Sequence, residues 1–572
     1  MNKYIQNKTL VRTEQPACTT MIVGKKATVD GSVIVAHSDD DVTDERVIYV
    51  PAADYPDGAK RPVYYDDASL GYNSKYNSTE LRRYIGTSRG PGYNTKDYPP
   101  SKPLGEIPQV KHTYAYFDSS YGIMNEHQLM IGECTCGAKV HPEPEPGKRI
   151  FYSAELSRVA LERCTKAREA IKLISDLIEQ YGYYGTGETL LIGDPDEAWV
   201  MEMCGYDKDG TDGIWVAQRV PDDGYFVAAN EFRIRKVDVN SLDMMYSANL
   251  FKVCEEQDCW KPSEGQLDWL KTVSWGEYSH PYYSLRRVWR ALSKAAPSLN
   301  LPAWVEDEYT KAYPFSVNPD KKLSVADIAA IYRDHYEGTE FDLTKGRAAG
   351  PFGDPTRYEK NPDQGDDTWN LNKYQPKGAW ERPLSIYRCG MMWINQGRSF
   401  LPDPVGGVSW IGLDRPAATC LMPFYAGVNE LPELVETMNL IKFTRDSAWW
   451  AFNFVGNYAT IKYSYMINDI NEKQKELEGG ALSVQSAVDQ AAQILCQKGQ
   501  ENLCRTFLTS FCKSNTEEVV SSWWKLSETL IVKYNDGCIT EDQIMQQVGY
   551  PEDWLNDVGY LEGPTSYKKK QK

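Results

Sequence analysis

The sequence predicts an α+β protein in which sheets pack as a sandwich with helices outside, followed by a helical C-terminal module. Apolar, β-branched runs joined by polar turns indicate antiparallel hairpins near the N-terminus and around residues 114–136. Apolar residues recur at the 3.6-residue period of an amphipathic helix from Ser153, its expected N-cap, to Tyr181. The pattern turns helical again from Ser447 to Asn535, with expected breaks at Gly479-Gly480 and Gly499.

The first hairpin is the most informative stretch of the chain. It consists of two runs, Thr19–Val23 and Ser32–Ala36, separated by eight residues that include the turn pair Asp30-Gly31. If the strands pair symmetrically about this loop, the ends of the two runs face each other and Cys18 comes opposite His37. We therefore expect the hairpin to place a thiol beside the polar end of the second strand.

The side chains at that strand end are titratable. Cys18 would lie among His37, Asp39 and Asp40, whereas a buried structural cysteine normally sits among apolar side chains. The pattern favours a nucleophilic thiol. The alternative is a surface hairpin that carries an inert cysteine.

Further strands are predicted along the chain. The runs Thr189–Ile192, Ala198–Met203 and Ile214–Arg219 follow the predicted helix and are separated by Gly- and Asp-containing loops. Three more, which begin at Leu384, Val408 and Thr419, follow a Gly/Pro/Asp-rich stretch. Together these strands supply the sheets of the predicted sandwich.

The composition of the chain limits the classes of partner and the cell compartment that we expect. A net charge of -17 argues against nucleic acid or an anionic membrane as a partner, because either would need a basic face. No run of 18 apolar residues is present, and residues 1–17 lack the apolar segment of a secretory signal. The thirteen cysteines have no disulfide or zinc spacing, which favours a reducing compartment, expected to be the cytoplasm.

The first hairpin also resembles a known family. Cys18-Thr-Thr, an aliphatic pair, Gly-Lys-Lys, then Asp-Gly-Ser and an acidic cluster are similar to the start of the cysteine dipeptidases of the N-terminal-nucleophile (Ntn) hydrolase superfamily. The resemblance implies a four-layer αββα Ntn-hydrolase sandwich. It also implies that a leader, residues 1–17, is removed so that Cys18 becomes the N-terminus. The expected units are then a catalytic core at 18–445 and a helical module with a basic tail at 446–572.

The resemblance assigns roles to other residues. Asp40 would orient the freed amine, Asn230 at a strand end would stabilise the oxyanion, and Arg287 matches an active-site arginine of the related acylases. Asn125 belongs to a Gly-x-x-Asn-Glu turn that resembles a second signature of the family and is expected to contact substrate. From the residues alone, Asn125 and Asn230 are equally explained as turn residues, and Arg287 as an ordinary helix residue.

One position departs from the family pattern. His37 stands where the acylases and many dipeptidases have arginine. If that arginine supplies positive charge to the thiolate or to the substrate carboxylate, His37 does so only below its pKa, about 6.5 when unperturbed. We expect His37 and Asp39 to contact the substrate.

The chemistry that these residues permit is thiol catalysis. A thiolate needs an adjacent base, and the α-amine of an N-terminal cysteine, with a pKa of about 7.7–8.0, is suited to that role near neutral pH. The chain has six histidines and no H-E-x-x-H pattern, so no metal site is predicted and no cofactor is expected.

The sequence therefore predicts a cysteine dipeptidase whose substrate partner is a small, unblocked peptide. An amidase acting on N-acylated small molecules could use the same machinery. A non-catalytic protein that binds peptides or sugars through its aromatic loops is the alternative from another class. The oligomeric state stays open, and a homo-oligomer is compatible with the sequence.

Overall fold

A computed structural model describes residues 18–40, 45–65, 93, 102–205, 213–277, 282–358, 380–438 and 442–564. The predicted leader, residues 1–17, lies outside the described residues. Among the helices within these ranges, none is both long enough and apolar enough to cross a membrane.

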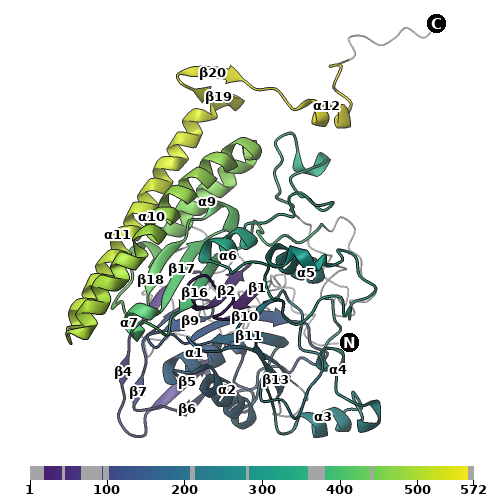
Figure 1. Cartoon of the computed structure of the whole chain (residues 1–572), viewed down its shortest axis with the longest axis vertical. Helices are drawn as coiled ribbons and strands as arrows, with labels where there is room; N and C mark the ends of the chain where they lie inside the picture. Colours follow the sequence, from purple (N-terminus) through teal and green to yellow (C-terminus); the bar gives the residue numbers. More distant parts are fainter. Residues whose placement is uncertain are drawn as a thin grey trace.

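Two antiparallel sheets form the centre of the molecule (Figure 1). The six-stranded sheet has the order β14-β1-β2-β16-β17-β18. Its strands are β1 (Cys18–Val23), β2 (Val33–Asp39), β14 (Tyr225–Ala228), β16 (Met391–Gly397), β17 (Val408–Leu413) and β18 (Met422–Tyr425). Every residue of all six strands is buried, so this sheet is covered on both faces.

The eight-stranded sheet has the order β15-β13-β12-β11-β10-β9-β8-β3. Its strands are β3 (Ile48–Val50), β8 (Tyr116–Asp118), β9 (Gly122–Asn125), β10 (Met130–Cys136), β11 (Gly187–Gly193), β12 (Ala198–Gly205), β13 (Gly213–Val220) and β15 (Met244–Tyr246). β10 and β11 lie against β1 and β2, so the two sheets pack face to face.

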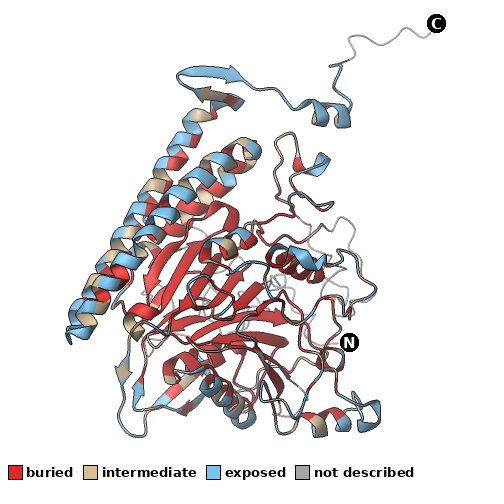
Figure 2. Cartoon of the chain, viewed as in Figure 1, coloured by how far each residue is buried: buried red, intermediate tan, exposed pale blue. Residues whose placement is uncertain are grey.

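Helices cover the outer face of each sheet. α1 (Ser153–Arg163) and α2 (Ala167–Tyr181) pack on the eight-stranded sheet, while α5 (Leu285–Ala295), α6 (Val325–Tyr332) and α9 (Ala448–Ala459) pack on the six-stranded one. Figure 2 shows the two sheets buried between these helices. The four-layer αββα arrangement is therefore confirmed.

The remaining elements are peripheral. Three two-stranded ribbons pair β4 with β7, β5 with β6, and β19 with β20. Their strands are β4 (Ala53–Asp54), β5 (Lys60–Tyr64), β6 (Pro103–Pro108), β7 (His112–Thr113), β19 (Cys538–Glu541) and β20 (Ile544–Gln547). The short helices are α3 (Leu250–Glu256), α4 (Trp269–Val273), α7 (Asp403–Gly406), α8 (Glu433–Glu436) and α12 (Glu552–Val558).

The first hairpin is present, but its predicted register is wrong by two residues. Cys18 pairs with Asp39, and His37 pairs with Thr20. The loop is longer than expected because Ser32 does not enter the strand: its N–H and its hydroxyl both donate to Asp30 Oδ1, at 3.1 and 2.6 Å. A shift of two residues keeps every side chain on its predicted face, so Cys18 and His37 still lie on the same side of the sheet.

The helix predicted from Ser153 to Tyr181 is two helices. Ser153 is the first helical residue of α1 rather than its N-cap, and α1 ends at Cys164, which is extended with φ -118°. The amide of Asn125 donates to the carbonyls of Leu161 and Cys164, at 2.9 and 2.8 Å, and so satisfies carbonyls at the end of α1. The expected stop at Gly182, with φ 72°, is confirmed.

Two predictions in the C-terminal half are also wrong in detail. The run that begins at Leu384 does not form a strand, and β16 begins only at Met391. α10 (Tyr463–Gln497) passes through Gly479-Gly480 without a break. A Cβ added to either glycine would have no atom within 4 Å. The predicted break at Gly499 is confirmed, with φ 69°.

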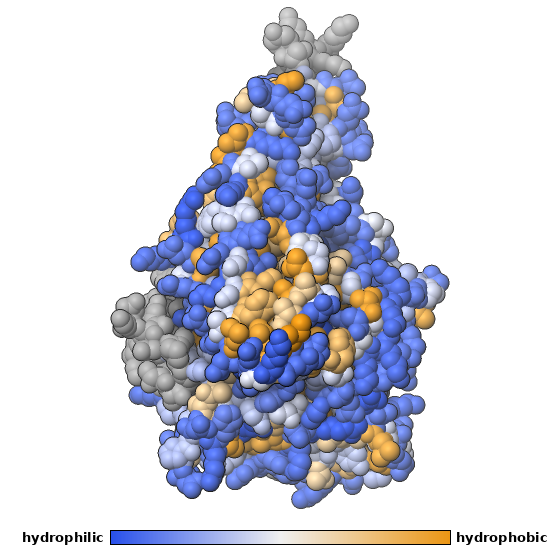
Figure 3. Space-filling model, turned by 60° about the vertical axis from the view of Figure 1, so that its left-hand side comes forward, coloured by the Kyte–Doolittle hydropathy of each residue, from blue (hydrophilic) through white to orange (hydrophobic). Residues whose placement is uncertain are grey.

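The long helices α10 and α11 (Glu501–Lys533) pack against each other and against β18. A buried ion pair, Arg398 Nη1 to Asp489 Oδ2 at 2.5 Å, connects α10 to the segment that follows β16. The face of the molecule shown in Figure 3 is mostly hydrophilic, with apolar side chains gathered in patches. The predicted division of the chain at residue 445 stays a prediction.

Candidate functional site

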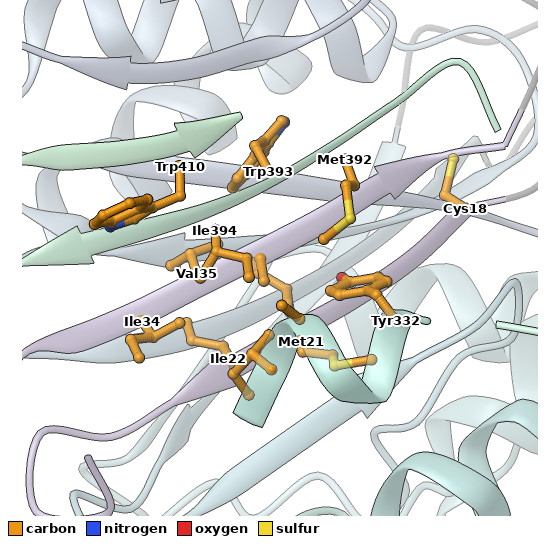
Figure 4. Packing of buried hydrophobic residues seen from close by; sticks show 14 of the residues in the cluster. Cys18, Met21, Ile22, Ile34, Val35, Tyr332, Met392, Trp393, Ile394 and Trp410 are labelled. Carbon is orange, nitrogen blue, oxygen red and sulfur yellow. The ribbon is translucent and has the colours of Figure 1, made fainter. Parts of the chain in front are cut away.

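Cys18 lies at the start of β1 and is 1% exposed. Figure 4 shows it at one end of the strand, away from Ile22 and from the aromatic side chains Trp393 and Trp410. Its thiol does not face apolar groups alone: Sγ donates a hydrogen bond to Glu133 Oε1 at 2.8 Å. The candidate nucleophile thus contacts a carboxyl group from the opposite sheet.

Glu133 and His37 meet at the edge of β10. The pairing of β9 with β10 is described only at Met130 with Met124. Three residues farther along β10, the backbone carbonyl of Glu133 is bonded to Nδ1 of His37 at 2.9 Å. The bond from the His37 imidazole to Glu133 joins the polar end of β2 to β10 of the opposite sheet.

His37 is neutral at physiological pH. Burial lowers the pKa of its imidazole to about 4, although the bond to the Glu133 carbonyl and the charge of Asp40 act in the opposite direction. Because a carbonyl only accepts, Nδ1 carries the proton and Nε2 carries the lone pair. The pH below which His37 would carry a positive charge, expected at about 6.5 for an unperturbed imidazole, is therefore lowered to about 4, and burial is the reason.

Glu133 belongs to a buried chain of acidic groups. Burial, and then the neighbouring carboxyl of Glu188, raise the pKa of Glu133 well above its usual value. The Tyr152 hydroxyl donates to Oε1 of Glu188. The side chain of Glu188 is also hydrogen-bonded to that of Glu133. Two carboxyls that share a buried site do not both ionise readily, so the pair retains a proton to higher pH than an isolated glutamate.

The same surroundings keep the Cys18 thiol protonated. Burial is the first cause of its raised pKa, followed by the charges of Glu133 and Asp39. Asp39 is the cross-strand partner of Cys18. In a chain where Cys18 is preceded by Ala17, the thiol is therefore a poor nucleophile unless a base takes its proton.

Arg287 approaches Cys18 from the backbone side. This side chain comes from the first turn of α5 and is fully buried. Nη1 donates to the Cys18 carbonyl at 2.7 Å and to Thr19 Oγ1 at 3.0 Å, and Nη2 donates to the Ala229 carbonyl at 3.1 Å.

The Arg287 guanidinium donates two further hydrogen bonds. Nη2 also donates to Asn230 Oδ1 at 2.7 Å, and Nε donates to the Tyr283 carbonyl at 3.1 Å. All five N–H groups are thus used. The structure therefore brings Arg287, Asn230 and Cys18 together.

Asn230 has the features of a turn residue within this group. It follows β14 in the left-handed conformation, with φ 65°. Nδ2 donates to the Thr135 carbonyl at 2.8 Å, and the backbone N–H donates to Cys134 Sγ at 2.8 Å. Asn230 is therefore a turn residue that contacts Arg287 and Cys134, and its part in stabilising an oxyanion stays a prediction.

Asp40 is buried in an ionic contact of its own. Arg382 Nη2 donates to its Oδ2 at 2.6 Å, and the Ser38 hydroxyl donates to the same oxygen at 3.2 Å. Its backbone carbonyl accepts from Arg388. Oδ1 is buried and has no hydrogen-bond partner in the described structure. A buried carboxylate oxygen without a donor is a candidate acceptor for a group that the site later acquires.

Asn125 has a structural environment. Its Oδ1 accepts from the backbone N–H groups of His127 and Leu129, both at 3.0 Å. Its Nδ2 donates to the two carbonyls that end α1. These bonds tie the β9–β10 turn to α1, and a part in substrate binding stays a prediction.

The donor atoms of Cys18, His37 and Glu133 lie within 4.8 Å of one another. A tetrahedral zinc site would bring such atoms to about 3.3–3.8 Å, given zinc–ligand distances of about 2.0–2.3 Å. Because the thiol already donates to the carboxyl, we interpret the cluster as a proton-transfer site. Glu133, Glu188 and Arg382 were missed from the sequence, since no spacing pattern joins them to Cys18.

Comparison with known proteins identifies relatives of this chain. The model of peptidase family C69 matches residues 17–476. A "Probable dipeptidase" of Latilactobacillus sakei is 25% identical over 493 residues, which cover 84% of this chain and 89% of that protein. A "Probable dipeptidase" of Salmonella dublin is 27% identical over 72% of this chain and 81% of its own length.

Two further proteins are more distant. "Dipeptidase A" of Lactobacillus helveticus is 22% identical over 90% of this chain and 94% of its own. Among solved structures, a penicillin V acylase from Agrobacterium tumefaciens aligns with 71% of this chain and 86% of its own at 9% identity. The TM-score of that alignment is 0.29, which is too low to support an argument about either protein.

Proposed function

Because the chain belongs to peptidase family C69, we propose that it is a dipeptidase that cleaves unblocked dipeptides with the Cys18 thiol as nucleophile. The observation that carries this proposal is the position of Cys18. Its thiol bonds to a buried carboxyl on one side, and its carbonyl is held by Arg287 on the other. The related proteins named as dipeptidases support the choice of substrate.

Removal of residues 1–17 would supply the base for catalysis. While Ala17 is attached, the nitrogen of Cys18 is an amide and cannot accept a proton. Once freed, the α-amine has a reference pKa of about 7.7–8.0 and can take the thiol proton near neutral pH. We assign Asp40 to orient this amine, since its Oδ1 is a buried acceptor that has no donor.

The hydrolytic cycle then has two steps. The thiolate attacks the peptide carbonyl, the amine returns its proton to the leaving group, and water hydrolyses the resulting thioester. Asn230 would donate to the developing oxyanion, and Arg287 would hold Asn230 and the Cys18 backbone in place. The bond from Arg287 Nη2 to Asn230 Oδ1, at 2.7 Å, supports this assignment.

The acidic strand end suits the substrate's free ammonium. We assign Asp39, which lies opposite Cys18 in the register of the hairpin, to bind that ammonium. His37, neutral and adjacent, would contribute hydrogen bonding rather than charge to substrate binding. An amidase that acts on N-acylated molecules would have no use for this carboxylate.

The compartment follows from the cysteines. All thirteen lie within the described residues and all are free thiols. Free thiols persist in a reducing environment, so we propose the cytoplasm as the site of action.

The first test concerns the leader. Purified wild-type protein is expected to lack residues 1–17, and Cys18→Ala is expected to retain them, because the thiol performs the cleavage. Intact mass spectrometry measures both. Cys259→Ala, which removes an exposed thiol elsewhere, is the matched control and should mature normally. An active wild type that still carries all 17 residues would contradict the proposal.

The second test isolates the Asn230 amide. Asn230→Gly removes the amide but tolerates the left-handed backbone, whereas Asn230→Ala adds strain at φ 65°. If the amide stabilises the oxyanion, Asn230→Gly lowers kcat by about 10²–10³-fold, or about 2.7–4 kcal/mol. Steady-state kinetics on Ala-Ala, together with a thermal melt, separates this loss from a loss of fold. A wild-type kcat in the glycine variant would leave Asn230 as a turn residue only.

The third test separates the dipeptidase from the amidase. An unblocked dipeptide such as Ala-Ala should be cleaved at least about 10²-fold faster than N-acetyl-Ala-Ala, because the acetylated substrate leaves a buried carboxylate unpaired. The two compounds are compared at equal concentration by kcat/KM. Activity should survive EDTA and be lost on thiol alkylation. Faster turnover of the acetylated compound would favour the amidase.

A further inference from the structure

The proposed removal of residues 1–17 requires a base that the mature enzyme does not need. The nucleophile of self-cleavage is the Cys18 thiol, but its own nitrogen is still an amide at that stage. Some other group must therefore accept the thiol proton. We propose that the Glu133 carboxylate is this group, and that it acts as the catalytic base of leader removal; the inference rests on the proposed function.

Geometry singles out Glu133. Its Oε1 accepts directly from Cys18 Sγ at 2.8 Å, within the reach expected of a general base. The two residues are 1% exposed each, so bulk water does not compete for the proton. The contact joins residues 115 positions apart in the chain, so it is a product of the packing of the two sheets.

The neighbouring titratable groups are less suitable. Nδ1 of His37 is committed to the Glu133 carbonyl, and burial leaves its imidazole weakly basic. Asp40 is paired with Arg382 at 2.6 Å. Asp39 lies across the strand pair and acts on the thiol through its charge. Among the carboxylates described near the thiol, Glu133 is the one shown to accept its hydrogen bond.

The groups behind Glu133 strengthen it as a base. Glu188 is hydrogen-bonded to it, and Tyr152 in turn donates to Glu188. A carboxylate that shares a buried site with a second carboxyl binds a proton more tightly than an isolated one. A stronger base accepts the thiol proton more readily, which favours transfer.

The reaction balances with water as the only co-reactant. The thiol proton passes to Glu133 as Sγ attacks the carbonyl carbon of Ala17. The Ala17–Cys18 C–N bond then breaks, and the proton moves from Glu133 to the departing nitrogen, which leaves a thioester between Ala17 and Sγ. Water hydrolyses the thioester, releasing the leader as a carboxylic acid and restoring the thiol. Arg287, bonded to the Cys18 carbonyl, holds the residue during these steps.

The experiment follows maturation of the full chain by intact mass over time after synthesis. Glu133→Gln, which keeps the shape but removes the base, is expected to lose residues 1–17 more slowly by roughly 10²–10⁴-fold. Glu202→Gln is the matched control, because Glu202 is another fully buried glutamate, bonded to the backbone of Arg233 and Ile234. It should mature at the wild-type rate. Circular dichroism establishes that each variant is folded.

Two further variants distinguish a base from a structural support. Glu133→Asp retains a carboxylate drawn back by one methylene and should mature with an intermediate rate, slower by about 10–100-fold. Glu133→Ala should be accelerated by added formate, whereas a merely structural role would not respond to it. Should Glu133→Gln fail to fold, these two measurements decide the question.

The outcomes are separable. A wild type that keeps residues 1–17 overturns leader removal itself, and the role of Glu133 with it. A wild type that matures while folded Glu133→Gln matures equally fast overturns only the role of Glu133. Slow maturation of Glu133→Gln with rescue of Glu133→Ala by formate is the result that the inference predicts.

Discussion

A hydrogen bond between a buried thiol and a buried carboxyl is the interaction on which the site depends. It joins Cys18 of one sheet to Glu133 of the other, and the His37 imidazole bonds to the backbone of the same glutamate. Charged groups are costly to bury, so this region retains protons: the pKa values of Cys18 and Glu133 are both raised. The fold thus keeps the Cys18 thiol in its protonated form.

Cys18 lies between acidic groups and a cation. Carboxyls face the thiol, whereas the Arg287 guanidinium holds the backbone carbonyl with one of its five hydrogen bonds. A new ammonium at the Cys18 nitrogen would add a positive charge beside Asp39 and Asp40, where it is favourable. Leader removal would therefore place a positive charge among the acidic side chains and, in the same step, supply the base for turnover. Cleavage of the Ala17–Cys18 bond would thus change the chemistry of the site without a change of fold.

The sequence was sufficient for the architecture, but not for the contacts across the sheets. The hairpin of Cys18 and the helical C-terminal region follow from local patterns. The predicted strand register was wrong because Ser32 bonds to Asp30 instead of pairing with the opposite strand. Symmetry about the loop does not predict this local hydrogen bond. Glu133 was missed because its contact with Cys18 depends on how two distant strands cross. The low pKa of His37 could not be read from the sequence, because burial is a tertiary property. Arg287, which the sequence alone explains as an ordinary helix residue, donates to the backbone carbonyl of Cys18 and to the Thr19 hydroxyl.

The central claim is that Cys18 acts as an N-terminal residue, so that one residue carries both the thiol and the free α-amine. The most direct measurement is condensation with 2-cyanobenzothiazole, which forms a stable ring only with a 1,2-aminothiol. Our account predicts a single adduct on the active protein, mapped by peptide mass spectrometry to Cys18, with loss of dipeptidase activity in proportion to labelling. Full activity in a protein that forms no such adduct would contradict it.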